Sequence, residues 1–369
     1  MKENWTYKKV KEVCKKASSN IVLNKIEDNT GDFPLYGASG FVKGVDFYHR
    51  DEPYIGIVKD GSGVGRVDVY PAKSSLVGTM QYILPQKECS LKYLCYALQG
   101  LNLSQFVNGA AIPHIYFRDY GECTIPVPPI ETQSCIVSEL DLLQSIIDKQ
   151  KAQVKELDNL AQAVFYDMFG DPVENEKGWE VKKLGEVCIT ITKGTTPTTV
   201  GFSFVSEGVN FVKVESFDKG KIDASKLTHI TKDCNDALSR SQLEDLDLLI
   251  CIAGATIGKM AIVDSSILPA NTNQACAIIR LKNKSSLVYV QSFLAHKFRL
   301  DVEQMGKGVA QPNLSLGQLR ELQIPLPPLF LQQSFASKIE SIEKQKAAIT
   351  QSITETQRLF DYTMDKYFG

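Results

Sequence analysis

Two glycine-rich turns are the first places in this sequence where chemistry could occur. They read Gly61-Ser-Gly-Val-Gly65-Arg66 and Gly254-Ala-Thr-Ile-Gly258-Lys259, so each ends in a basic residue. A phosphate loop needs four residues between its glycines and a Ser or Thr after its lysine, but three intervene in the second turn and Met260 follows. Strand-like sequence rather than a helix follows the glycines, which disfavours a dinucleotide or methyl-donor site. We interpret both as tight hairpin turns, with contact to a phosphate as the alternative.

Motifs of catalytic centres do not occur in the sequence. It contains no GxSxG, no HExxH and no interpretable carboxylate or Cys/His constellation. The NPPY-like tetrapeptide of adenine methyltransferases is missing as well, because the two diproline segments read Val-Pro-Pro-Ile and Leu-Pro-Pro-Leu. The nine cysteines include no CxxC pair, which is typical of reduced, mostly buried thiols. We predict a non-catalytic chain that holds neither a metal nor a cofactor.

Charge is nearly balanced over the 369 residues, with 41 Lys and Arg against 43 Asp and Glu. A net charge of −2 argues against a polybasic nucleic-acid binder. By segment, however, residues 1–130 carry 15 basic and 13 acidic side chains, 131–171 carry 3 and 8, 172–328 carry 18 and 17, and 329–369 carry 5 and 5. This division would allow the two slightly basic segments to bind a polyanion while the acidic segment 131–171 contacts another protein. The start has no export signal and no run of about 18 apolar residues occurs, so we expect a cytoplasmic protein without membrane contact.

The elements that must position these turns are duplicated. Residues 5–14 (WTYKKVKEVC) match 179–188 (WEVKKLGEVC), and the two glycine turns match each other. Further matches pair 109–115 with 308–314 and 125–129 (IPVPP) with 324–328 (IPLPP). In this alignment of the two copies, Thr79 corresponds to Thr272 and Gln81 to Gln274. Four matched blocks in one order predict two equivalent folds that differ in their loops.

Each half contains short Val/Ile/Tyr/Phe-rich runs separated by turns. Runs at 54–58, 79–84, 248–252 and 275–281 predict strands, and 91–98 and 286–294 predict helices. Each IPxPP segment is interpreted as a stiff extended lead into the following helix. The sequence therefore predicts mixed α/β (α+β) domains with β-rich cores at 1–130 and 172–328.

A proline-free segment of about 40 residues follows each IPxPP and predicts a long helix, at 131–171 and at 329–369. Apolar residues recur there with alternating spacings of four and three, as in a coiled coil, and Phe-Gly closes each segment. We predict that the two helices pair antiparallel; the alternative is that each lies on its own domain. The seam residues are Leu140, Leu143, Ile147, Val154, Leu157, Ile339, Ile342, Ile349, Ile353 and Phe360.

This combination of features resembles the specificity (S) subunits of type I restriction-modification systems. The resemblance rests on two domains that open with the Trp-x-x-Lys-Lys block, close with Gly-x-Ala-x-Pro and Ile-Pro-x-Pro-Pro, and continue into a long helix. It covers the whole chain, which is somewhat short for the family. The first copy has Ile112 and His114 where the second has Gln311 and Asn313, so the two copies are not expected to share a base contact there.

The resemblance implies that each domain is a target-recognition domain for one half of a bipartite, asymmetric site in double-stranded DNA. The helix pair would hold the domains apart, since 38 helical residues span about 57 Å. It would also dock two methyltransferase (modification) subunits that supply S-adenosylmethionine and flip the target adenine, joined by restriction and motor subunits. The alternatives are a specificity subunit of a restriction-methylation enzyme outside type I, and a two-domain enzyme dimerised by its helices.

Candidate DNA contacts are polar residues in turn-like segments of the two halves. Arg or Lys can pair with guanine and Asn or Gln with adenine, but the sequence assigns no base. The candidates are Lys43, Tyr48, His49, Arg50, Lys59, Arg66 and Arg118 in the first half, and Lys193, Thr195, Thr196, Lys213, Lys259, Asn271, Asn273, Gln274 and Lys307 in the second.

Overall fold

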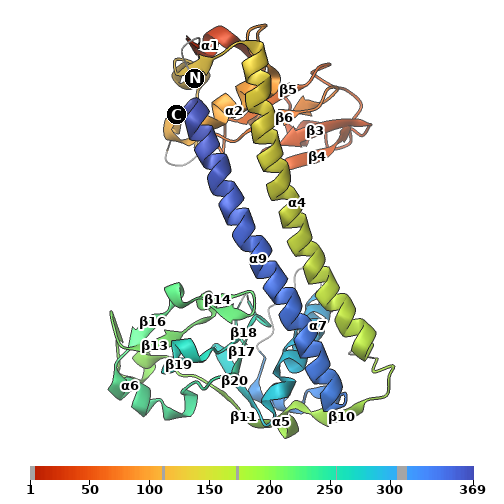
Figure 1. Cartoon of the computed structure of the whole chain (residues 1–369), viewed down its shortest axis with the longest axis vertical. Helices are drawn as coiled ribbons and strands as arrows, with labels where there is room; N and C mark the ends of the chain where they lie inside the picture. The colour runs from red at the N-terminus through yellow and green to blue at the C-terminus, as the bar shows by residue number, and fades with distance from the viewer. Residues whose placement is uncertain (1–4, 110–112, 172–173, 255, 306–313) are drawn as a thin grey trace. The chain divides into compact units, whose positions relative to one another are not determined.

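The computed structural model describes residues 5–109, 113–171, 174–254, 256–305 and 314–369 (Figure 1). The chain forms two compact units: unit 1 comprises residues 1–153 and 349–369, and unit 2 comprises residues 154–348. Each unit therefore combines one globular domain with parts of the two long helices. The predicted fold class is confirmed, because each domain is a β-rich α/β structure and the two share the topology of their central sheets.

The core of unit 1 is a four-stranded antiparallel sheet in the order β2-β8-β5-β6. Its strands are β2 (Cys14–Ser18), β8 (Met80–Pro85), β5 (Tyr54–Val58) and β6 (Val67–Tyr70). Every residue of β5 is buried, as expected for the apolar run of a central strand. Helix α2 (Leu91–Gly100) packs Tyr93, Leu94 and Leu98 into the same core.

The core of unit 2 repeats this arrangement in the order β11-β20-β17-β18. Its strands are β11 (Cys188–Lys193), β20 (Cys276–Leu281), β17 (Leu248–Cys251) and β18 (Met260–Ile262). Helix α7 (Leu287–Met305) takes the place of α2 and buries Tyr289, Val290 and Phe293. The predicted strands and helices lie at or next to these observed elements.

A short strand pair anchors the start of each long helix. In unit 1, β1 (Thr6–Lys9) pairs with β9 (Thr124–Val127), and in unit 2, β10 (Glu180–Lys183) pairs with β21 (Gln323–Leu326). The short helices α1 (Val10–Val13), α3 (Phe117–Tyr120), α5 (Leu184–Val187) and α8 (Leu316–Glu321) flank these pairs. In both units the diproline segment follows directly and the long helix begins at the next residue, which confirms that the IPxPP segments are extended leads.

A second sheet differs between the domains. Unit 1 has the order β4 (Gly40–Val45), β3 (Phe33–Gly37), β7 (Ser75–Leu76). Unit 2 has the order β12 (Phe204–Val205), β16 (Thr228–Ile230), β13 (Val209–Val212), β19 (Ala270–Thr272), together with helix α6 (Lys232–Ala237) and the hairpin of β14 (Phe217–Asp218) and β15 (Lys221–Ile222). The pairs β3–β7 and β13–β19 are parallel. The duplication therefore preserves the central sheet and changes the sheet beside it.

The long helices are α4 (Ile130–Phe169) and α9 (Leu329–Phe368). In unit 1 the Tyr367 hydroxyl donates to the Glu139 carboxylate at 2.6 Å. In unit 2 the Lys346 ammonium lies 2.7 Å from the Asp158 carboxylate. Residue numbers thus fall along α9 as they rise along α4, which confirms the antiparallel pairing.

The predicted seam residues are buried to different depths, and Leu140, Ile339 and Phe360 also pack with the domain cores. Leu140, Leu143, Ile147 and Ile342 are buried, whereas Val154, Leu157, Ile339, Ile349, Ile353 and Phe360 are partly buried. Polar contacts interrupt the seam in the less buried part, where Gln150 Nε2 donates to Ser352 Oγ at 2.7 Å. A polar layer of this kind can specify register at some cost in stability.

Backbone hydrogen bonds align the two domains residue by residue. The N–H of Lys59 donates to Thr79 O at 3.0 Å, and the N–H of Ile252 donates to Ala275 O at 2.8 Å. Thr79 therefore corresponds to Ala275, not to Thr272, and the predicted matches of Thr79 and Gln81 are wrong by three residues. The reason is that the second domain carries three additional residues between its glycine turn and β20.

Candidate nucleic-acid interface

The glycine-rich turns are hairpin connections, as the sequence indicated. Residues 61–66 join β5 to β6 and residues 254–259 join β17 to β18, and both strand pairs are antiparallel. The N–H groups of Gly65 and Gly258 donate to the last residue of the preceding strand at 2.8 and 2.9 Å. Both glycines have positive φ angles, +89° and +85°, which other residues rarely adopt. Each turn thus carries an exposed basic side chain, Arg66 or Lys259, next to the central sheet.

Beside the first turn lies a group of charged and aromatic residues that we call the His114 cluster: Lys59, Asp60, His114, Tyr116 and Arg118. The Asp60 carboxylate contacts His114 Nδ1 and lies 3.4 Å from Lys59 Nζ. The rings of His114 and Tyr116 have centroids 4.1 Å apart, and the Arg118 guanidinium lies 4.6 Å from the Tyr116 ring centroid. The Arg118 side chain is 77% exposed. The cluster therefore ends in an exposed guanidinium stacked on an aromatic ring, a surface suited to phosphates or bases.

The backbone fixes the position of this cluster. Asn108 and His114 exchange N–H···O bonds of 2.8 and 2.9 Å, and the Gly61 N–H donates to Pro113 O at 2.9 Å. The Ile115 N–H donates to Lys59 O at 3.0 Å, as the Leu314 N–H does to Ile252 O in the second domain. The segment before α3 is therefore tied to the glycine turn in the first domain, and the corresponding segment before α8 is tied to the end of β17 in the second.

Other candidates of the first domain are engaged in the protein. Lys43 Nζ donates to Ile26 O at 3.0 Å and to Glu27 O at 2.8 Å, so its ammonium closes a loop. Arg66 Nη1 donates to Ala38 O at 2.7 Å while its side chain stays exposed.

Tyr48, His49 and Arg50 lie together beside the second sheet. Tyr48 is 38% exposed and meets Phe33 edge-on. The Arg50 guanidinium covers Tyr82 at 4.6 Å from the ring centroid, and His49 Nδ1 lies 3.4 Å from the Tyr82 hydroxyl. Burial, and then the neighbouring Arg50 charge, lower the pKa of His49 below its ordinary value.

In the second domain, five polar residues meet near the end of β11: Lys193, Thr195, Thr196, Arg240 and Gln274. The Thr196 hydroxyl donates to Gln274 Oε1, and Arg240 Nη2 lies 3.5 Å from Thr195 Oγ1. Lys193 and Gln274 are exposed. These residues form a polar surface able to donate and accept hydrogen bonds at base edges.

The remaining candidates of the second domain make other contacts. Lys213 Nζ lies 4.0 Å from the Phe204 ring centroid. Asn273 Oδ1 accepts from the Ala275 N–H at 3.1 Å and supports the turn before β20. Lys307 lies outside the described residues.

Asn271 is an interior residue, and its prediction as a DNA contact is wrong. It is fully buried in β19, where its Nδ2 donates to Asn235 Oδ1 at 2.9 Å and its Oδ1 accepts from Ser241 Oγ at 2.7 Å. The Thr272 N–H also donates to Asn271 Oδ1 at 2.9 Å. Because this side chain is satisfied inside the domain, it has no surface to offer a base.

The structure adds four residues that the sequence did not predict as DNA contacts: Asp60, Tyr116, Arg240 and Phe41. Phe41 is 65% exposed on β4. A signal for Tyr116 and Arg118 was present, because His114, Tyr116 and Arg118 stand at every second position of the sequence. No sequence signal indicated Arg240, whose contact with Thr195 spans 45 positions, or Phe41, which lies in the hairpin of β3 and β4.

Cys14 and Cys188 are free, buried cysteines. Burial raises the pKa values of Cys14 and Cys188 to about 12, so both stay protonated at neutral pH. Among the described side chains, no group of three or more His, Cys, Asp or Glu is arranged to hold a metal ion. Within the same residues, none of the helices has an apolar stretch that could span a lipid bilayer.

Known proteins share both the sequence pattern and the fold. The chain is 24% identical over 291 residues to the specificity subunit of the type I restriction enzyme EcoBI from Escherichia coli, covering 69% of this chain and 60% of that protein. It is 25% identical over 308 residues to the MjaVIII specificity subunit from Methanocaldococcus jannaschii, covering 77% and 71%. The first alignment thus spans less than two thirds of the relative's length.

Two solved structures have the same fold. The S subunit of a type I restriction-modification system from M. genitalium matches with a TM-score of 0.61 at 15% identity, covering 99% of this chain and 96% of that one. A chain from a structure on complex assembly and conformational transition of the type I system matches with a TM-score of 0.58 at 18% identity, covering 99% and 98%. Residues 2–157 and 176–357 each match the type I restriction modification DNA specificity domain. The chain therefore belongs to the family of type I restriction-modification specificity subunits and carries its DNA specificity domain twice.

Proposed function

We propose that this chain selects the DNA site of a type I restriction-modification complex, with each domain reading one half of a bipartite, asymmetric sequence in double-stranded DNA. One observation carries the proposal: the central sheet, glycine turn and helix lead are built twice, whereas the adjoining sheets differ. The shared framework places the DNA-recognition surface of each domain in an equivalent position. The different second sheets allow the two domains to recognise different DNA sequences.

The candidate contacts support different half-sites. The first domain offers the His114 cluster, with its stacked Arg118, and the exposed aromatic side chains Phe41 and Tyr48. The second offers Thr196, Gln274, Lys193 and Arg240 at the end of β11. Arginine over an aromatic ring suits guanine and phosphate, whereas a Thr–Gln pair suits adenine edges.

Catalysis belongs to the partners in this proposal. Two methyltransferase subunits dock on the chain, bind S-adenosylmethionine and flip the target adenine, and restriction and motor subunits join them. The chain itself supplies recognition and no catalytic residue, and it acts in the cytoplasm, where the DNA is. The acidic segment 131–171, with 3 basic and 8 acidic side chains, favours contact with protein over DNA.

A methylation assay with purified components tests the proposal. The cognate methyltransferase subunit is incubated with DNA and labelled S-adenosylmethionine, with and without this chain. We expect methylation that depends on the chain and is confined to a split motif. Methyl transfer by the isolated chain, or transfer that is unaffected by the chain, would contradict the proposal.

A further inference from the structure

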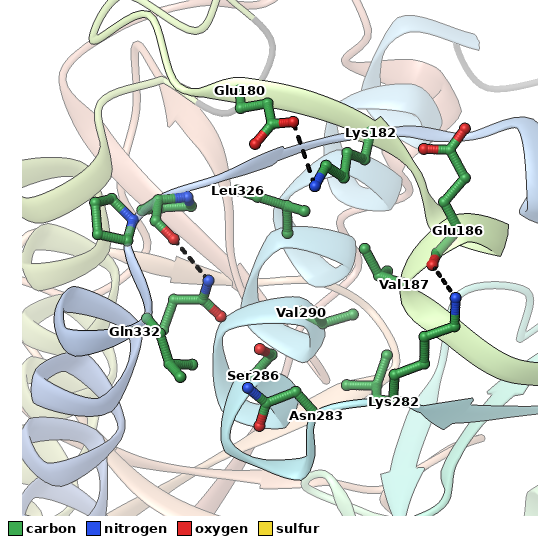
Figure 2. Close-up of a pocket in the computed structure, with 14 residues that line it drawn as sticks. Glu180, Lys182, Glu186, Val187, Lys282, Asn283, Ser286, Val290, Leu326 and Gln332 are labelled. Carbon is green, nitrogen blue, oxygen red and sulfur yellow. Dashed lines mark hydrogen bonds and ion pairs between the residues drawn. The ribbon is translucent and has the colours of Figure 1, made fainter.

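A pocket lies at the foot of α9 in unit 2, and we call it the helix-foot pocket (Figure 2). It has a volume of about 430 Å³ and lies between β10, the ends of α5 and β20, the start of α7 and the first turn of α9. Leu326, Val290 and Leu329 supply apolar walls, and Gln332 and Ser286 supply polar groups. The pocket belongs to the duplicated framework and not to the second sheet.

Gln332 brings an unsatisfied hydrogen-bond acceptor to this pocket. Its side chain is 4% exposed, and its Nε2 donates to Pro327 O at 2.8 Å. That carbonyl fixes the orientation of the amide, since the opposite orientation would place two oxygens together. The Oε1 atom is buried, has no hydrogen-bond partner among the described residues, and points toward the pocket interior (Figure 2). A buried acceptor without a donor is costly, so a donor from outside is favoured there.

In the first domain, the equivalent glutamine has the hydrogen-bond donor that Gln332 lacks. Gln133 is the counterpart of Gln332, and its Nε2 donates to Pro128 O at 2.9 Å in the same way. Its Oε1, however, accepts from the Ser90 N–H at 2.9 Å. In the second domain the corresponding N–H, that of Ser286, donates instead to Asn283 O at 3.1 Å in a short 3₁₀ turn. The donor that completes the first site is therefore used elsewhere in the second.

A second difference lies at the neighbouring helix start. Phe330 is 67% exposed and follows Leu329, which is 40% exposed. The first domain has an exposed glutamate, Glu131, in the place of Phe330. Exposed aromatic side chains beside a partly polar pocket are typical of protein interfaces, whereas a small polar ligand gains little from them.

Charge in the pocket favours a neutral guest. Lys182 Nζ lies 3.2 Å from the Glu180 carboxylate, and Lys282 Nζ donates to Glu186 O at 2.8 Å. Two acidic and two basic side chains line the pocket. A charged ligand would therefore be attracted by one pair and repelled by the other. A primary amide matches this setting, because it donates to Gln332 Oε1 and accepts from a hydroxyl or an ammonium group.

We propose that the helix-foot pocket receives an Asn or Gln side chain from a protein partner whose apolar residues pack on Leu329 and Phe330. This inference rests on the proposed function, in which that partner is one of the methyltransferase subunits. The matching position in the first domain has its own donor and a glutamate, so the two docking sites are unequal.

Thiol protection tests the pocket. Ser286→Cys places a thiol in the pocket, and Ser90→Cys places one at the matching position of the first domain. Each variant is treated with iodoacetamide, alone and with excess cognate methyltransferase subunit, and the modification of each peptide is followed by mass spectrometry. We expect the subunit to slow modification at position 286 at least about tenfold and at position 90 less than about twofold.

A second experiment measures binding of the methyltransferase subunit to the Phe330→Glu variant, with Glu131→Gln as the control. We expect Phe330→Glu to weaken one of two binding steps about tenfold in calorimetry, and Glu131→Gln to leave both steps unchanged. If the complex forms but position 286 reacts at the same rate and Phe330→Glu binds normally, the pocket proposal fails and the proposed function stands. If the unaltered chain forms no complex, both fail.

Discussion

His114 lies between Asp60 and Tyr116, with its imidazole against the carboxylate on one side and its ring 4.1 Å, centroid to centroid, from the phenol on the other. This arrangement fixes Tyr116, on which the exposed Arg118 guanidinium rests. The first domain thus presents a preorganised cation at its surface, which loses little entropy when it binds.

Arg118→Ala is expected to weaken specific DNA binding of the assembled methyltransferase complex by about 1–3 kcal/mol, the value of a good arginine contact. Fluorescence anisotropy with a cognate duplex at fixed salt measures the change. Lys43→Ala is the matched control, because the Lys43 ammonium already donates to two backbone carbonyls. Equal losses for the two variants would show that the cluster has no special part in recognition.

Asn271→Ala is expected to destabilise the second domain by about 1–3 kcal/mol, because Ser241 and Asn235 lose a buried partner. Gln274→Ala, at an exposed position, is expected to change stability by less than about 0.5 kcal/mol and to weaken DNA binding instead. Thermal unfolding and anisotropy on both variants separate the effects. The assignment is contradicted if Asn271→Ala unfolds normally but binds DNA poorly.

Leu140→Ala is expected to destabilise unit 1 by about 2–5 kcal/mol, since Leu140 on α4 is fully buried in the domain core, against which Phe360 of α9 also packs. Leu142→Ala, two residues away and 62% exposed, is the control and is expected to change stability by less than about 0.5 kcal/mol. Denaturant unfolding followed by circular dichroism measures both. Similar midpoints for the two variants would argue against the seam.

His49 makes stability depend on pH. Its pKa is lower in the folded domain than its ordinary 6.5, so the unfolded chain takes up a proton first as the pH falls. The free energy of unfolding is therefore unaffected by His49 above about pH 7 and decreases as the pH drops below 6.5. We expect His49→Gln to lose less thermal stability than the unaltered chain between pH 7.5 and 5.5. An NMR titration that places the His49 pKa above 6.5 would refute this.

Much of the framework could be predicted because its signals are local or repeated. The apolar run at 54–58 defines β5, the diproline segments mark both helix starts, and the four-three spacing identifies the seam. The second sheets could not be predicted, because strands such as β7 and β12 have two residues each and depend on distant pairing.

Individual site residues were harder to predict for the same physical reason. A polar side chain such as Asn271 looks like a surface residue until Asn235 and Ser241 are known to surround it. Arg240 reaches Thr195 across 45 positions of sequence, a contact that no local pattern encodes. The three additional residues before β20 also displaced the predicted match of Gln274.

Methylome sequencing of cells that express a domain-exchanged chain tests the central claim most directly. Residues 1–130 are replaced by the corresponding domain of another specificity subunit, and the chain is expressed with its methyltransferase subunit. We predict a split adenine-methylated motif in which one half changes while the other half and the gap stay the same. A continuous palindrome, a change in both halves, or methylation that is independent of this chain would contradict the account.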